Sequence, residues 1–495
     1  MKFFLNALGK LFVIAPECAV RGFCYSIAWI LVKIPSSRSY SILANLYRCF
    51  PEKSEKERVS IAIESAARTM EMGFFVLAMP FFKKSELKKR FVLAKSTEYE
   101  LSIFEKKPTL LLVPHSSMME TASLFPSLTD IELPKVGVMY RPFDNDSLES
   151  WIKTTREKFG VKLLSRKKDL RLTFDYLKNN DILAIMFDQN PRDRGSLGLF
   201  MGMLATHTSM PSIFQDRFNN LQSGILYAKR TGFWRSELHV KKLAPKNDKE
   251  IMFLANQWLE EQLQGDMQKD WLWLHNRWSY GSQIEKEFII YNPVNYLKEN
   301  LDFLNLPECP RKRKYFLNVP FGIKEVLDVL SCVSTLQKSR YDSLFVILTK
   351  RKYADLIAAF SIADDVKISP ESCCILGSLY RAKKLRKEYS NVIVQFNGSN
   401  VGRFLAKIMG APRCFTFGKK KSLKDTLFVA NELNLEVYKS FFKKFGAEGD
   451  FESLQKPEIS VIKKDKKFVE FLCNGKSIKL SSKDFEIFEK YFSNK

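Results

Sequence analysis

Short apolar runs that alternate with helical segments constrain the fold of this chain most strongly. TLLLVP (109–114), VGVMY (136–140) and DILAIMF (181–187) each have the length of a buried strand, and polar residues follow each of them. Apolar positions recur at three- and four-residue steps over 57–78 and 148–159, which is typical of amphipathic helices. The pattern predicts an α/β sheet with polar residues at the strand ends, where open sheets of this class bind ligands.

The alternation stops and restarts once along the chain. Residues 291–312 contain three prolines, after which strand-like and helical runs begin again. A chain of 495 residues is long enough for two domains with separate cores. We therefore expect a first domain over 1–290, with membrane-associated helices over 1–85. A linker (291–312), a single Rossmann-like α/β domain (313–445) and a basic tail (446–495) should follow.

The charge balance restricts the class of partner. The formal net charge of +24 should attract phosphates, anionic lipids or an acidic carrier protein. The sequence contains no zinc-finger spacing, RNA-binding aromatic signature or basic heptad region, so we expect no nucleic-acid partner. Nine scattered Cys without a C-x-x-C motif indicate a reducing compartment, and with only four His we expect no metal site.

Two apolar stretches in the first 85 residues have two interpretations. Residues 22–32 and 72–82 are uninterrupted by charge but far shorter than the roughly 20 residues needed to span a bilayer. They fit helices that lie in the membrane interface, and they fit core helices of a globular domain equally well. Lys10, Glu17 and Arg21 interrupt the N-terminal region, so a cleaved signal peptide is not expected.

The segment PHSSMME contains the strongest candidate for chemistry. His115 follows a predicted strand, and Glu120 is expected in the first turn of the next helix. A carboxylate that accepts the imidazole N–H fixes the tautomer and makes the other ring nitrogen a general base. The spacing alone also fits a hydrogen-bonded core histidine and a carboxylate that stabilises a helix N-terminus.

Further landmarks accompany this pair in a fixed order. They are Asn45-Leu46, Phe50-Pro51-Glu52, YRPFDN (140–145), Arg156 with Gly160, Asp188-Gln189, FMG (200–202) and WLWLHNRW (271–278). With its H-x4-E motif, the region 1–290 resembles the late acyltransferases of lipid A biosynthesis, the lauroyl and myristoyl transferases. The interior of the motif is Ser-Ser-Met-Met, where that family usually has aromatic residues and Asn. This departure puts the identity of the acyl chain or acceptor in doubt.

The resemblance implies a reaction. An acyl group would pass from acyl carrier protein, or from coenzyme A, to a hydroxyl of a membrane glycolipid related to lipid A, at the cytoplasmic face of the bacterial inner membrane. His115 would be the base, Glu120 its orienting carboxylate, and no cofactor would be needed. Arg156, or alternatively Arg141, would stabilise negative charge on the thioester carbonyl. The alternatives are another membrane lipid as acceptor, such as a lysophospholipid, and an inactive membrane scaffold.

The resemblance also suggests supporting roles for other landmarks. We expect Asp188 and Gln189 to tie loops together beside the site, and His275 and Arg277 to hold the C-terminal edge of the domain. Residues 313–445 are similar to the N-terminal half of the lipopolysaccharide heptosyltransferases (glycosyltransferase family 9). That family has an acidic residue directly after the glycine of its first loop, whereas Ile323 follows Gly322 here and Glu325 is displaced. We therefore predict a non-catalytic domain that binds glycan acceptor or partners.

Overall fold

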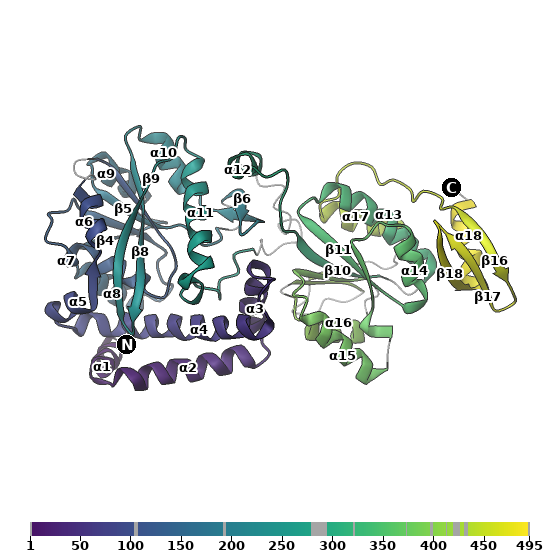
Figure 1. Cartoon of the computed structure of the whole chain (residues 1–495), viewed down its shortest axis with the longest axis horizontal. Helices are drawn as coiled ribbons and strands as arrows, with labels where there is room; N and C mark the ends of the chain where they lie inside the picture. Colours follow the sequence, from purple (N-terminus) through teal and green to yellow (C-terminus); the bar gives the residue numbers. More distant parts are fainter. Residues whose placement is uncertain are drawn as a thin grey trace. The chain divides into compact units, whose positions relative to one another are not determined.

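The chain divides into two compact units, each built on its own sheet (Figure 1). The computed structural model describes residues 2–102, 107–191, 195–278, 295–319, 322–372, 374–396, 399–411, 413–418, 426–429 and 434–493. The first unit comprises the described residues of 1–201, 205–279 and 292–307, and the second comprises 202–204 and the described residues from 308 onward. Both units combine helices with largely parallel sheets, so the predicted α/β class is confirmed.

A seven-stranded sheet forms the centre of the first unit. Its order is β1 (Phe91–Leu93), β9 (Arg235–Leu243), β8 (Gln222–Gly232), β2 (Thr109–Val113), β5 (Ile182–Met186), β3 (Val136–Tyr140) and β4 (Val161–Ser165). All neighbouring strands are parallel except β8 and β9, which form an antiparallel pair. The carboxyl ends of β2, β5 and β3 therefore meet at one edge, as the sequence predicted. A separate two-stranded sheet pairs β6 (Ser196–Phe200) with β7 (Met203–His207).

Four N-terminal helices pack together in the first unit. They are α1 (Lys2–Ile14), α2 (Glu17–Lys33), α3 (Ser37–Cys49) and α4 (Glu55–Ala78). Helix α4 begins at a capping box, in which Ser54 Oγ accepts from the Glu57 backbone N–H and Glu57 accepts from the Ser54 backbone N–H. Helices α1 and α2 lie against α4, as Figure 1 shows.

The apolar stretches 22–32 and 72–82 differ in how far their side chains are buried. In residues 72–82, Phe75, Ala78 and Met79 are fully buried, so this stretch includes part of the core. In residues 22–32, Phe23 and Trp29 are about half exposed. Among the described residues no single helix is long and apolar enough to cross a membrane. Only α1 and α2 taken together, bent by 114°, meet that criterion.

The remaining elements of the first unit surround the sheet. They are η1 (Met79–Phe81), α5 (Lys84–Arg90), α6 (Lys95–Ser102), η2 (Met119–Leu124), α7 (Phe125–Leu128), α8 (Asp146–Glu157), α9 (Leu170–Lys178), α10 (Met210–Arg217), α11 (Glu250–Gln264), η4 (Asp266–Lys269) and α12 (Leu297–Leu304). Helix α12 lies inside the predicted linker, but it packs against β6 and α11 and therefore belongs to the first unit.

The second unit contains a six-stranded parallel sheet. Its order is β12 (Asp365–Ile368), β11 (Ser343–Thr349), β10 (Arg313–Asn318), β13 (Val392–Gln395), β14 (Arg413–Gly418) and β15 (Thr426–Val429). The strand order reverses between β10 and β13. The helical elements are α13 (Ile323–Ser339), α14 (Arg351–Ala359), η7 (Pro370–Ser372), α15 (Ile375–Arg386), α16 (Asn400–Met409) and α17 (Leu435–Lys444).

Residues 459–493 are folded, although the sequence suggested only a basic tail over 446–495. An antiparallel sheet of β16 (Ile459–Lys464), β17 (Phe468–Cys473) and β18 (Lys476–Ser481) is followed by α18 (Ser482–Ser493). Strand β18 packs on α14 and helix α18 on α13, with Phe471, Phe485 and Phe488 fully buried. These rings continue the core of the second unit.

Candidate active site

Two neighbouring strands bring His115 and Asp188 together. His115 is the second residue after β2 and Asp188 the second after β5, and the last residues of these strands, Val113 and Met186, are register partners. His115 Nδ1 lies 2.6 Å from Asp188 Oδ1, and the His115 backbone N–H donates to Asp188 Oδ2 over 2.9 Å. The indole N–H of Trp271 also donates to Oδ2, over 2.6 Å. Three donors thus fix one buried carboxylate.

The state of Asp188 determines the tautomer of His115. Burial alone would raise the Asp188 pKa, but the charge that His115 carries when its ring is protonated, and the hydrogen bonds from His115 and Trp271, bring that pKa below its ordinary value. An ionised carboxylate only accepts hydrogen bonds, so Nδ1 of His115 carries the hydrogen. Nε2 makes no hydrogen bond within the described part of the chain, and the side chain retains 11% exposure. The ring therefore presents a lone pair on Nε2.

The carboxylate of Glu120 binds Arg156 instead of His115. Glu120 lies in the first turn of η2, as predicted, and accepts from Arg156 Nε (2.9 Å) and Nη2 (2.5 Å) in a bidentate pair. Burial lowers the pKa of Arg156, but the charge and hydrogen bonds of Glu120, together with the charge of Glu149, outweigh burial, and the net shift is upward. The expected hydrogen bond between Glu120 and His115 is wrong, because the imidazole N–H is already directed at Asp188. Asp188 thus contacts the candidate base itself. It also connects the His115 loop to Trp271, in line with the expected role of holding loops together.

Arg141 and Gln189 lie outside this cluster. Arg141 is exposed after β3 and makes no hydrogen bond or ion pair with any described residue. The Gln189 side chain is exposed as well, and only its backbone carbonyl is engaged, by Arg277 Nη1 at 3.4 Å.

The aromatic segment 271–278 supports the His115 loop from one side. The Leu272 backbone N–H donates to the His115 carbonyl over 3.0 Å. Asn45 Nδ2 donates to the carbonyls of Trp273 and His275 over 3.0 and 2.9 Å. Nε2 of His275 in turn accepts from the Asn190 backbone N–H over 2.8 Å. Two of the landmarks, Asn45 and the segment 271–278, therefore connect to each other, and the segment also contacts the His115 loop.

Two ion pairs connect α4 to its surroundings, one to the residue before segment 271–278 and one to β8, and the sequence did not reveal them. Arg68 pairs with Asp270 at 2.9 Å, and Asp270 accepts from Ser117 Oγ at 2.5 Å. One turn further along α4, Glu71 pairs with Arg230. Burial raises the pKa of Glu71, and the Arg230 charge offsets only part of this. The available signal was the alternation of charge at helical spacing in Glu64, Arg68 and Glu71 on one side of α4.

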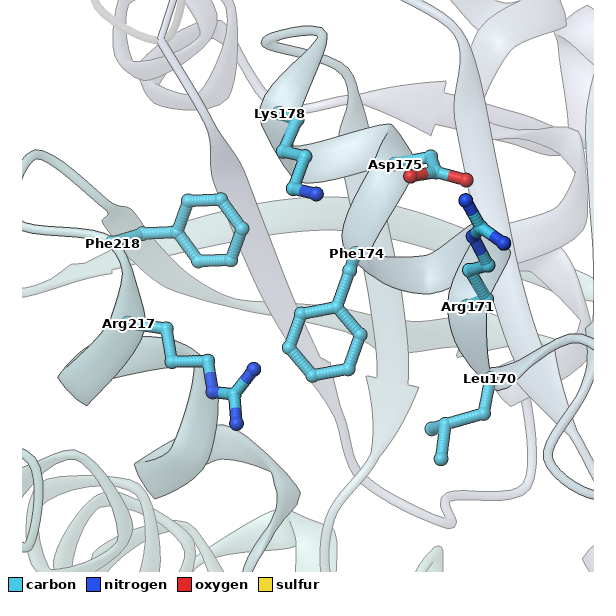
Figure 2. A pocket seen from close by; sticks show the side chains of 7 residues that line it. All are labelled: Leu170, Arg171, Phe174, Asp175, Lys178, Arg217 and Phe218. Carbon is cyan, nitrogen blue, oxygen red and sulfur yellow. The ribbon is translucent and has the colours of Figure 1, made fainter.

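The surface hollow in Figure 2 is a different place. It is lined by Leu170, Arg171, Phe174, Asp175, Lys178, Arg217 and Phe218, which come from α9, the end of α10 and the residue after it. The Arg217 guanidinium lies 5.3 Å from the centre of the Phe174 ring. None of the His115 cluster lines this hollow.

The fold and the His115–Asp188 pair define an α/β protein with a candidate general base at the strand ends. Residues 1–280, more than half of the chain, match the family described as bacterial lipid A biosynthesis acyltransferase. The chain belongs to this family, as the landmarks predicted.

Two curated relatives and two solved structures are similar to parts of the chain. A lipid A biosynthesis acyltransferase of Haemophilus influenzae is 23% identical over 219 residues, covering 43% of this chain and 66% of the relative. A lipid A biosynthesis lauroyltransferase of Escherichia coli is 26% identical over 173 residues, covering 34% and 55%. The chain thus spans slightly under two thirds of the first relative and about half of the second.

The two structures are glycosyltransferases. E. coli ADP-heptose lipopolysaccharide heptosyltransferase II matches at 12% identity and a TM-score of 0.23, over 29% of this chain and 42% of that one. A family 9 glycosyltransferase of Veillonella parvula matches at 11% and 0.26, over 29% and 45%.

Proposed function

We propose that this chain is an O-acyltransferase that moves a fatty acyl group from a thioester to a hydroxyl of a lipid A-type glycolipid. The observation that carries the proposal is the His115–Asp188 pair with an available Nε2, in a member of the lipid A acyltransferase family. The donor is a thioester of acyl carrier protein or of coenzyme A. The net charge of +24 suits both an acidic carrier protein and a phosphorylated acceptor.

His115 acts as the general base in this proposal. Nε2 removes the proton of the acceptor hydroxyl while its oxygen bonds to the thioester carbonyl carbon. When the tetrahedral intermediate collapses, the C–S bond breaks and the imidazolium returns the proton to the leaving sulfur. The Asp188 carboxylate keeps the proton of the resting ring on Nδ1 and stabilises the imidazolium. No co-reactant is required.

Arg156 supplies the positive charge in this proposal. Glu120 occupies its Nε and Nη2, and Nη1 makes no hydrogen bond among the described residues. Nη1 remains able to donate to the carbonyl oxygen as negative charge develops there, or to a phosphate of the acceptor. Glu120 then acts through Arg156 by fixing its position. Arg141, exposed and unpaired in the described chain, is the alternative donor.

A panel of variants tests these roles. His115→Ala should lower acyl transfer by several orders of magnitude, and Asp188→Asn by about 10²- to 10⁴-fold, because the ring loses its fixed tautomer. Glu120→Gln should lower turnover through Arg156 and leave the acidic limb of the pH–rate profile in place. His239→Gln, a histidine that contacts Glu237 and Tyr227 instead, is the matched control.

The assay uses purified full-length protein, acyl carrier and coenzyme A thioesters of several chain lengths, and lipid A precursors. Folding of each variant is checked by thermal unfolding. Wild-type turnover in a folded His115→Ala protein would refute the base. Turnover with lysophospholipid but not with lipid A precursors would reassign the acceptor, and absence of both transfer and thioester hydrolysis in the wild type would favour a scaffold.

We also propose that α1 and α2 lie in the interface of the inner membrane at its cytoplasmic face. Supporting this, they expose Phe3, Phe4, Leu11, Ile14, Phe23, Tyr25, Trp29 and Ile30. Lys10 and Arg21 are exposed on the same helices, and apolar side chains with Lys/Arg are the combination that favours headgroup depth. The experiment is flotation with vesicles. Phe3→Ser/Phe4→Ser/Ile14→Ser should reduce flotation, and unchanged flotation would exclude α1 as the contact.

For the second unit we propose glycan binding without sugar transfer. Asn318 and Gln395 end the strands between which the order reverses, and Asn318 Nδ2 donates to Gln395 Oε1 (2.5 Å) and Glu371 Oε1 (2.9 Å). The Asn318 Oδ1 has no partner in the described chain but is enclosed, so in this proposal the surrounding side chains move aside before a glycan hydroxyl donates to it. Asn318→Ala should weaken binding of a lipid A core glycan about 10-fold. Sugar transfer from a nucleotide sugar that Glu325→Gln abolishes would contradict the proposal.

A further inference from the structure

The face formed by α15 and α16 exposes apolar side chains in an unusual concentration. The two helices pack side by side (Figure 1). Five large apolar side chains on them are 57–81% exposed: Ile375, Leu376, Tyr380, Val401 and Phe404. The other exposed large apolar side chains of the described second unit are Tyr341, Val461 and Ile462, of which only the last two are neighbours. We call these five side chains and the cations of the same helices the α15–α16 face.

The same helices are strongly cationic. Their 22 residues (12 in α15 and 10 in α16) contain no Asp or Glu. They contain six cations, namely Arg381, Lys383, Lys384, Arg386, Arg403 and Lys407. Lys383, Lys384 and Lys407 are exposed and form no ion pair with described residues. The α15–α16 face thus leaves its five apolar side chains exposed, and Lys383, Lys384 and Lys407 form no ion pair in the described chain.

The nearest carboxylates are already engaged. Glu371, just before α15, accepts from Asn318 and from Ser399 Oγ. Glu388, just after α15, pairs with Lys314 and Lys367. The positive charges of Lys383, Lys384 and Lys407 therefore remain available to an external anion.

We propose that the α15–α16 face is a membrane-binding surface for bilayers rich in anionic lipid, separate from the contact proposed for α1 and α2. The projecting apolar side chains enter the boundary between the headgroups and the acyl chains of the lipid. This contact needs no partner of complementary shape. The surrounding Lys and Arg side chains meet the anionic headgroups. The ring of Tyr380 suits the headgroup level, and that of Phe404 suits the acyl boundary below it. The inference goes beyond acyl transfer and does not depend on the chemistry at His115.

The test measures vesicle binding by the full-length chain. The vesicles are phosphatidylcholine alone, or a mixture of phosphatidylcholine and phosphatidylglycerol, whose anionic headgroups attract Lys/Arg clusters. Each variant is made in the wild type and in Phe3→Ser/Phe4→Ser/Ile14→Ser, so that binding through α1 does not conceal the effect. All substitutions are on exposed side chains, and thermal unfolding verifies that each protein is folded.

Two triple variants address the two properties of the face. Ile375→Ser/Leu376→Ser/Phe404→Ser should weaken binding to anionic vesicles at least about 10-fold in the background that lacks the α1 contact. Lys383→Gln/Lys384→Gln/Lys407→Gln should do the same, and only for anionic vesicles. The matched control, Lys463→Gln/Lys464→Gln/Lys466→Gln on β16 and the residues after it, removes the same charge and should change binding less than about 3-fold.

Three results would overturn the proposal. Unchanged binding in the apolar triple would show that the projecting side chains do not enter the bilayer. An equal loss of vesicle binding in the β16 control would show that the effect depends on the net charge of the protein and not on this face. Unaltered vesicle binding together with lost binding of acyl carrier protein, measured on the same variants, would make the face a protein-docking surface instead.

Discussion

One buried histidine makes the first unit sensitive to mild acid. His207 is 3% exposed, and its Nδ1 accepts from Arg277 Nη2 (2.7 Å) and Asn256 Nδ2 (3.0 Å). Burial and the Arg277 charge hold the His207 pKa well below its ordinary value, so the ring is neutral in the fold. In the unfolded chain the pKa is about 6.5. The unfolded state therefore binds the extra proton below that pH, and stability should fall by up to about 1.4 kcal/mol per pH unit.

Urea unfolding at pH 7.5, 6.5 and 5.5 measures this loss, and His207→Gln should remove it. Comparison of the two proteins is needed, because the raised pKa of Glu71 contributes the opposite slope. A carboxyl group with a raised pKa stabilises the fold increasingly as pH decreases, whereas His207 destabilises it. If wild type and His207→Gln differ by the same free energy at all three pH values, the ring does not titrate as described.

The sequence identified the right residues near the base but not all of their pairings. His115, Glu120, Arg156 and Asp188 were all candidates, because each belongs to a motif. The contact between His115 and Asp188 depends on β2 and β5 being register neighbours, and strand order is not visible in one sequence. Local spacing favoured the closer carboxylate, Glu120, which instead neutralises Arg156.

At the scale of elements, α3 contacts the aromatic segment 271–278 through the side chain of Asn45. Asn45 is fully buried, and its amide donates to two carbonyls of segment 271–278. Asn45→Asp replaces the donor by a carboxylate that faces both carbonyls. We expect a loss of at least about 2 kcal/mol in the free energy of unfolding, since buried carbonyls lose their donors. Thermal and urea unfolding measure it, with exposed Asn179→Asp as control. Equal stability of the two variants would exclude this anchoring role.

Long periodic elements were predictable, whereas the C-terminal sheet was missed. Strands β2, β3, β5 and β11 and helix α4 follow clear apolar patterns. In β16–β18 many Lys residues obscured the two-residue alternation, although FVEFLC alternates in burial throughout. Asn474 and Gly475 join β17 to β18 with φ of 48° and 77°, and Asn-Gly between alternating runs is a strong hairpin signal. That dipeptide was the available evidence for a folded C-terminus.

At the scale of the whole molecule, all seven Trp residues belong to the first unit: Trp29, Trp151, Trp234, Trp258, Trp271, Trp273 and Trp278. Tryptophan fluorescence therefore reports unfolding of that unit, whereas far-UV circular dichroism reports both. Because each unit has its own core, we expect the two probes to give non-coincident urea transitions.

Substitutions in each core should move the two transitions separately. Asn45→Asp should shift the fluorescence transition and leave the remaining dichroism transition in place. Phe441→Ala, in the phenylalanine-rich core of the second unit, should do the reverse at a cost of about 3–5 kcal/mol, because it leaves a cavity among Phe396, Phe417 and Phe445. If either substitution moved both transitions by the same free energy, the units would unfold as one cooperative body. The second unit would then contribute to the stability of the His115 site.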